Sequence, residues 1–182
     1  RDAGKPRMIV INKMDAENID LPGLVKSIQE TFGTECRCAN LPSADKSSVI
    51  DCVSNSEGDS PVMDVSQAHT ELIESVIEAD DALMESYLAG EEISTERIAS
   101  VFVEALKAGT LTPIVFTDAR DEVGINELLD IIAMYAPSPA QVATPALKAD
   151  EKDTEIKADP DGPLAGLVFR VAFDPRSNMK YS

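Results

Sequence analysis

The sequence predicts an α/β protein organised around a parallel β-sheet. Residues 8–11 and 113–116 are short, uninterrupted apolar runs, and each is followed by a polar loop and an amphipathic helix. Apolar runs of this length are typical of strands buried on both faces of a parallel sheet. The region between these two strand–loop–helix units, residues 34–110, has a different pattern and is expected to form an α+β insert.

The first unit occupies residues 1–33. Its strand covers Met8–Ile11, and its helix is expected to begin at Pro22, because proline fits the first helical turn. Gly33 is expected to end the helix, because glycine accepts a left-handed backbone. The apolar residues of this helix recur at helical spacing: Leu24, Val25, Ile28 and Phe32.

The insert divides into a β part and a helical part. In residues 34–64, Cys36 and Cys38 alternate with polar residues and a turn-rich stretch follows, which predicts a small β insertion. One long helix is expected over Gln67–Ala89 and a second over Thr95–Ala108. The outer face of the long helix is acidic: Glu71, Glu74, Glu78, Asp80, Asp81 and Glu85.

The second unit, residues 111–136, repeats the order of the first, with a strand over Pro113–Phe116 and a helix that carries Ile125, Leu128, Leu129 and Ile132. Residues 137–163 hold five of the eleven prolines and almost no large apolar side chain, which indicates a linker. Residues 164–182 open with an apolar β segment, Leu164–Phe173, that has nothing to pair with in the sequence.

Composition excludes several classes of protein. Sixteen basic against 33 acidic residues give a net charge of −17, which disfavours broad contact with nucleic-acid phosphates, so no DNA partner is expected. No apolar stretch of membrane-spanning length and no signal segment occurs, so we expect a soluble, cytoplasmic protein without a membrane partner. The chain begins at Arg1, and a piece cut from a longer protein is one reading of this start.

The cysteine count indicates reduced thiols. Cys36, Cys38 and Cys52 are an odd number without secretory context. A metal site at Cys36 and Cys38, which share one strand face, is an alternative. Small core residues are favoured because His69 is the only histidine, and no metal site is predicted.

A polar tetrad, Asn12-Lys13-Met14-Asp15, directly follows the first strand, where ligands of parallel α/β sheets bind. The carboxylate of Asp15 can accept hydrogen bonds from both N–H donors on the edge of guanine, and the stem of Lys13 can lie along the base plane. Asn12 can hold the loop and reach guanine N7. Asparagine and aspartate are also common turn residues, so a purely structural role is the alternative.

The second strand also ends in a polar loop. Thr117-Asp118-Ala119 follows it, and the backbone N–H of a small residue there could donate to guanine O6. Because the carboxyl ends of parallel strands meet at one edge of a sheet, the two loops are expected to lie together. The sequence therefore predicts a guanine site formed by both loops.

Four segments resemble elongation factor G and its ribosomal GTPase relatives. Pro6–Asp15 is similar to the fourth nucleotide motif of that family, and Glu78–Glu92 to a helix of the insert that follows it. Pro113–Pro139 is similar to the fifth motif, the last helix of the G domain and its exit. Leu164–Pro175 is similar to the first strand of the next β-barrel. The four matches occur in the family's order.

The resemblance implies the C-terminal part of the parallel sheet of a P-loop GTPase, with an α+β insert, a linker and the first strand of a β-barrel domain. It implies a fragment of a ribosome-associated factor that binds GTP or GDP with magnesium and hydrolyses GTP in translation elongation and translocation. The guanine site would comprise Asn12, Lys13, Met14, Asp15, Thr117, Asp118 and Ala119.

The phosphate loop, switch segments and magnesium ligands of the family lie upstream of Arg1 and are not encoded in this chain. We therefore assign no catalytic residue and expect the chain alone neither to hydrolyse GTP nor to bind it in the micromolar range. Asp121-x-x-Gly124 and Asp159-x-x-Gly162 match the γ-phosphate motif D-x-x-G, but both follow the tetrad and are interpreted as turns.

Two departures indicate a divergent paralogue. Asp118 stands where the family usually has serine, and the stretch 34–64 is shorter than expected. Alternatives are a ribosome-protection or recycling GTPase of the same superfamily, or a non-catalytic module whose acidic helix, Gln67–Ala89, binds the ribosomal stalk protein. An unrelated α/β hydrolase is disfavoured, because His69 is the only imidazole and no G-x-S-x-G occurs near it.

Overall fold

The computed structural model describes residues 6–90, 94–138, 140–141, 147–149, 152–154, 159–162, 171–174 and 179–181. The chain divides into two compact units, Arg1–Pro137 and Ser138–Ser182. The first unit is a mixed α/β structure with a parallel sheet, which confirms the predicted fold class.

The sheet has three strands in the order β1-β5-β2, all parallel: β1 is Ile9–Ile11, β5 is Thr112–Phe116 and β2 is Cys36–Cys38. Every residue of the central strand β5 is buried, as its sequence predicted. The prediction that β1 is buried on both faces was wrong, because β1 is an edge strand of the described sheet and Val10 is 44% exposed.

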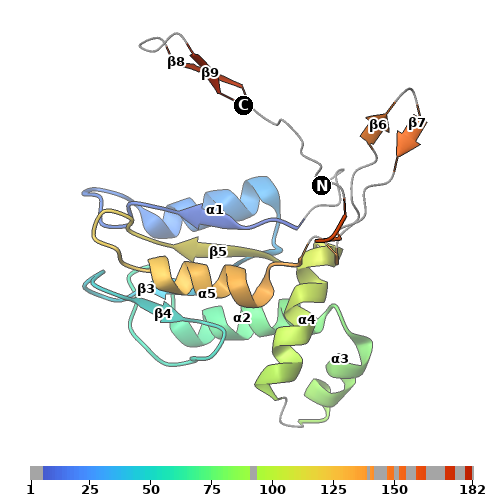
Figure 1. Cartoon of the computed structure of the whole chain (residues 1–182). Coiled ribbons are helices and arrows are strands. Elements are labelled where there is room, and N and C mark those ends of the chain that lie inside the picture. Colours follow the sequence, from blue (N-terminus) through green and yellow to red (C-terminus); the bar gives the residue numbers. More distant parts are fainter. Residues whose placement is uncertain are drawn as a thin grey trace. The chain divides into compact units, whose positions relative to one another are not determined.

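Helix α1, Leu21–Phe32, follows β1 and lies on the opposite side of the strands from α5, Ile125–Tyr135 (Figure 1). It begins one residue before Pro22, because the carboxylate of Asp20 caps it by accepting from the backbone N–H of Gly23 (2.9 Å). Gly33 ends the helix at φ 116° and ψ 165°. That conformation is essentially restricted to glycine, but it is not the left-handed helical one expected.

The predicted β insertion starts later than the sequence indicated. The segment Cys36–Cys38 is a strand of the main sheet, and the antiparallel hairpin is formed by β3, Asn40–Pro42, and β4, Val49–Asp51. Alternation identifies a strand but not its neighbour. The polar residue between the cysteines is accommodated because the Arg37 guanidinium pairs with Glu71 of the next helix (2.8 Å).

The prediction of a single helix over Gln67–Ala89 was wrong. Two helices replace it, α2 over Val65–Ile77 and α3 over Asp81–Leu88. The side chain of Asp80 accepts hydrogen bonds from two backbone N–H groups at the start of α3 (3.0 and 3.1 Å). An aspartate in this role starts a new helix, which explains the break inside a continuous apolar pattern.

Helix α4 covers Thr95–Ala108 as predicted, and Gly109 ends it in the left-handed conformation (φ 76°). It packs against both α2 and α5 (Figure 1). The ring of Phe102 on α4 stacks on Tyr135 of α5 with centroids 4.2 Å apart. This packing joins the insert to the last helix of the sheet domain through one core.

The described residues of the second unit form two antiparallel pairs. Strand β6, Leu147–Ala149, pairs with β7, Lys152–Thr154, inside the expected linker. Strand β8, Ala172–Asp174, pairs with β9, Met179–Tyr181, so the expectation of a β segment without a partner was wrong. Most of the expected strand Leu164–Phe173 lies outside the described residues.

Among the described residues, no helix is both long enough and apolar enough to cross a membrane.

Candidate functional site

The two polar loops lie side by side at the carboxyl ends of neighbouring strands. Ile11, the last residue of β1, is in register with Phe116, the last residue of β5. The pairing continues beyond the strands: the N–H of Thr117 donates to the carbonyl of Ile11 (2.9 Å), and the N–H of Met14 donates to the carbonyl of Thr117 (3.3 Å). The predicted meeting of the tetrad with residues 117–119 is therefore present in the structure.

The side chain of Asn12 ties these loops together. Its Oδ1 accepts from the backbone N–H of Lys13 (2.9 Å) and from the backbone N–H of Ala119 (3.0 Å), and Thr117 Oγ1 lies 3.5 Å away. The N–H of Ala119 thus donates to Asn12. In this arrangement it is not free to donate to guanine O6, which differs from the prediction. The Nδ2 group of Asn12 remains a donor that can face an acceptor such as guanine N7.

Lys13 holds an unusual backbone conformation at the turn after β1. Its φ is 62°, in the left-handed region, which costs a non-glycine residue of the order of 1–2 kcal/mol. The turn closes through the N–H of Ala16, which donates to the carbonyl of Lys13 (3.1 Å). Strain of this kind concentrates at binding and catalytic sites. The exposed side chain of Lys13 is free to lie along a planar group.

Met14 anchors the loop and does not face the site. Its side chain is fully buried, at 0% exposure, and belongs to the hydrophobic core. Met14 was predicted as a base contact, but a side chain with no exposed surface cannot touch a ligand outside the core. Thr117, at 1% exposure, is likewise buried beside the site, and its backbone groups and its hydroxyl contact the tetrad.

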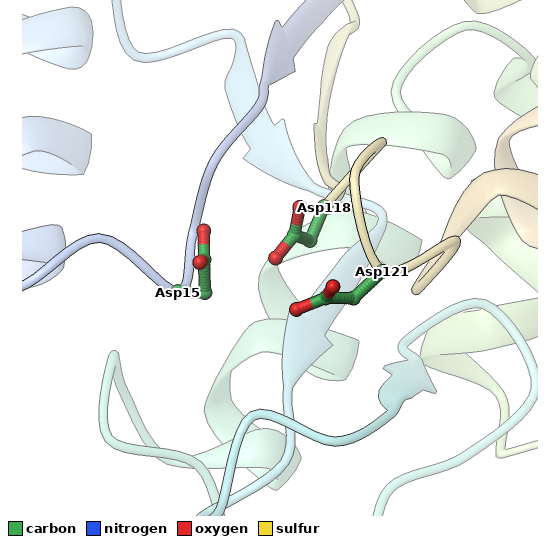
Figure 2. A group of neighbouring side chains, drawn as sticks. All are labelled: Asp15, Asp118 and Asp121. Atoms are coloured by element: carbon green, nitrogen blue, oxygen red, sulfur yellow. The ribbon is translucent and has the colours of Figure 1, made fainter.

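Three carboxylates face one another in front of the loops. Asp15 comes from the loop after β1, whereas Asp118 and Asp121 come from the loop after β5 (Figure 2). Their oxygens lie within 4.8 Å of one another. Asp118 is 2% exposed and accepts from the backbone N–H of Arg120 (3.0 Å), while the other two are exposed. The cluster is rich in acceptors, so donors or a cation would relieve its repulsion.

Asp121 is a member of this cluster that was not predicted, because the D-x-x-G pattern at this position indicated only a turn. The turn itself is confirmed. The backbones of Asp118 and Val123 exchange two hydrogen bonds (2.8 and 2.9 Å), and Glu122 has φ 59°. The return of the chain at Val123 brings Asp121 back toward Asp118. The second D-x-x-G segment is also a turn, closed by the N–H of Gly162 and the carbonyl of Asp159 (3.1 Å).

A second missed residue is Asn40 of β3, which is 1% exposed. Its Oδ1 accepts from the N–H of Phe116 (2.7 Å), and its Nδ2 donates to the carbonyl of the same residue (3.2 Å). A buried amide that satisfies both groups of one strand residue fixes the strand end just before Thr117. The available signal was a polar residue between two buried apolar ones, Ala39 and Leu41.

The cysteines are buried thiols. Burial raises the pKa of Cys38 to about 12, with Glu71 adding to the rise and Arg37 opposing it. Burial likewise raises the pKa of Cys52 to about 12. Thiols held neutral in this way are poor metal ligands. Among the described residues, the aspartate cluster is the one group that brings together three atoms able to ligate a metal ion, and these atoms are carboxylate oxygens.

His69, the residue considered for a hydrolase, contacts the carbonyl of Cys52 through Nδ1 (2.9 Å). The imidazole is thus held by the backbone of the insert. Its position favours a structural role over a catalytic one.

No protein-family profile matches the chain. The chain is 31% identical, over an alignment of 191 residues, to elongation factor G of Fervidobacterium nodosum, an alignment that covers 93% of this chain and 28% of the relative. A crystal structure of a protein from Thermus thermophilus is 30% identical and superimposes with a TM-score of 0.64, over 76% of this chain and 23% of that one.

These similarities define the class: the chain is homologous to part of a translation elongation factor. More particularly, it is a homologue of a segment of elongation factor G and spans 28% of the length of the relative it matches. The resemblance drawn from the sequence motifs is thereby confirmed.

Proposed function

We propose that this chain forms the guanine-reading end of a GTP-binding pocket. The observation that carries the proposal is the junction at Asn12, whose Oδ1 accepts from Ala119 and so holds the tetrad against the second loop. The exposed carboxylate of Asp15 lies in front of this junction. It can accept from the ring N–H and the exocyclic amine of guanine together, whereas adenine presents a different pattern.

The longer protein would bind GTP and GDP with magnesium and hydrolyse GTP on the ribosome, during elongation and translocation in the cytoplasm. The homology to elongation factor G supports this proposal. The phosphate and magnesium contacts would come from other segments, because no G-x-x-x-x-G-K-[ST] motif occurs in these 182 residues. The part assigned to this chain is recognition of the base.

The test is the substitution Asp15→Asn in the full-length protein. Loss of a buried, charge-assisted contact typically costs about 2–5 kcal/mol, so GTP affinity should fall about a hundredfold or more. Xanthine carries a carbonyl where guanine carries the exocyclic amine. An amide at position 15 can donate to that carbonyl, so affinity for xanthosine triphosphate should rise. Competition between the two triphosphates measures both effects.

The matched control is Glu17→Gln, which removes one exposed negative charge from the same loop without touching the cluster. It should leave the preference for GTP unchanged. If Asp15 only shapes a turn, asparagine should serve equally well, and an unaltered preference for GTP in Asp15→Asn would exclude the base-reading role.

A second candidate function is contact with the ribosomal stalk protein through α2 and α3. The observation that favours it is an exposed apolar end of α3, where Leu88 is 77% and Tyr87 is 38% exposed beside the acidic Glu85. Leu88→Ser should weaken binding of purified stalk protein to the chain, because an apolar contact would be lost. Unchanged binding would contradict this function.

Two acids of the predicted acidic face serve the fold, because Glu71 pairs with Arg37 and Asp80 pairs with Arg97. The other four form no ion pair with any residue that the structure describes: Glu74, Glu78, Asp81 and Glu85. A basic partner surface would therefore meet these four carboxylates first.

A further inference from the structure

A pocket of about 170 Å³ lies between α5 and the β3–β4 hairpin. It shares no lining residue with the aspartate cluster. Asp51 of β4 and the α5 residues Glu127 and Asp130 bring carboxylates to its wall, and Ile131 and Met134 bring apolar surface. The pocket therefore combines negative charge with an apolar side.

Tyr135 supplies the decisive polar group of this pocket. Its side chain is only 5% exposed, and its ring is fixed by stacking on Phe102. Its hydroxyl makes no hydrogen bond with any of the residues described, although no fully buried side-chain oxygen or nitrogen among them is left without a partner. The hydroxyl is therefore not fully buried, and Asp51, whose charge acts on it, lines the same pocket as Tyr135.

The charges around this hydroxyl are uncompensated. Asp51 uses Oδ1 to accept from the N–H of Val53 (2.8 Å), which leaves Oδ2 open. Glu127 and Asp130 take part in none of the ion pairs formed between described residues. Burial first, and the charge of Asp51 second, raise the pKa of Tyr135, so the hydroxyl stays protonated. The complement of such a pocket is a cation.

We propose that this pocket binds the guanidinium group of an arginine on a protein partner. A guanidinium has five N–H donors in a planar fork, so it can donate to Tyr135 and to carboxylates on two elements at once. An ammonium group is compact and more strongly hydrated, and it fits such a divided set of acceptors less well. The methylene stem of arginine would lie against Ile131 and Met134.

The probes are a capped Gly-Arg-Gly peptide, the same peptides with lysine or with citrulline, and agmatine. Each is titrated into the full 182-residue chain, and amide and methyl NMR shifts are followed. The arginine peptide should shift the signals of Tyr135, Met134 and Asp51 in a saturable way. Its affinity should be higher than that of the lysine peptide. Citrulline has nearly the same shape without the charge and should not bind.

The test variant is Tyr135→Phe, which removes only the hydroxyl and keeps the stacked ring. Loss of a hydrogen bond to a charged group should weaken arginine binding by about tenfold. The matched control is Glu30→Gln, which removes an exposed carboxylate of α1 outside the pocket and should leave binding unchanged. A native NMR spectrum of each variant establishes that it is folded.

Four results would overturn the proposal. If the citrulline peptide binds as tightly as the arginine peptide, the pocket does not recognise the charged guanidinium group. An unchanged affinity of folded Tyr135→Phe, or an equal loss in Glu30→Gln, would show that only the diffuse negative charge of the chain attracts the peptide. Binding of agmatine without binding of the arginine peptide would overturn the assignment to a protein partner.

Discussion

Gly124 directly precedes α5 as its N-cap residue, at a position where the loop after β5 turns back onto the strand. Its φ is 72°, and a Cβ atom placed there would lie 2.6 Å from the carbonyl oxygen of Phe116. That distance is far below any real contact of a Cβ atom, and backbone atoms of a buried strand cannot move away easily. We therefore predict that Gly124→Ala disturbs the end of β5, where the polar loop Thr117–Ala119 starts.

The expected loss of stability has two parts. A non-glycine residue in the left-handed region costs about 1–2 kcal/mol. Displacing the Phe116 carbonyl also breaks the hydrogen bond from Asn40 Nδ2 (3.2 Å) in a buried site. An unsatisfied buried group costs about 1–3 kcal/mol. The free energy of unfolding should therefore fall by about 2–5 kcal/mol in total.

The control is Gly109→Ala. Gly109 has nearly the same backbone conformation, φ 76°, but a Cβ atom there would meet nothing within 4 Å. Urea unfolding of both variants therefore separates the backbone term from the collision with Phe116. Gly124→Ala should lose clearly more stability than Gly109→Ala. Equal losses would refute the argument that Gly124 is required by its close approach to the strand.

Three further outcomes are expected. Asp118→Ser should tighten GTP binding by the full-length protein roughly fivefold, because it removes about 1 kcal/mol of like-charge repulsion from Asp15; a titration that shows no gain contradicts this. Asp80→Ala should lower the free energy of unfolding by about 1 kcal/mol or more through the lost cap of α3, and a thermal melt identical to wild type would exclude the capping role. The thiols of Cys38 and Cys52 have pKa values raised from 9.0 to about 12, so below pH 9 they are protonated in both the folded and the unfolded chain and give stability no pH dependence. Above pH 9 the unfolded chain loses these protons first, so stability should fall by up to about 1.4 kcal/mol per pH unit for each thiol, and a double alanine variant that declines as steeply as wild type would contradict the assignment.

Local patterns predicted the features that depend on local rules. The apolar run of β5, the bounds of α4 and the positions of both polar loops could be identified because strand, helix-cap and loop signals are set by a few neighbouring residues. The approach of Asp15 to residues 117–119 also followed, since parallel strands place their carboxyl ends at one edge.

The missed features depend on residues far apart in the sequence. Nothing near Cys36–Cys38 shows that this strand pairs with β5 instead of the hairpin, because pairing is decided by the rest of the sheet. The amide of Asn40 reaches Phe116 across 76 positions, and no local pattern records that contact. The break before α3 was different: its signal, Asp80 ahead of a second acid, was present but was outweighed by the continuous apolar spacing.

The proposed guanine site joins two loops more than 100 positions apart, since Asn12 and Ala119 differ by 107 positions. The cost of closing such a long loop grows only slowly with its length, by about 0.6 kcal/mol per doubling. The intervening insert also contributes buried residues to the same core, through α2, α4 and the β3 amide at Asn40. The insert therefore does more than separate the two motifs. By holding the end of β5 at Phe116, it fixes where Thr117 and the residues after it can meet the strained turn at Lys13.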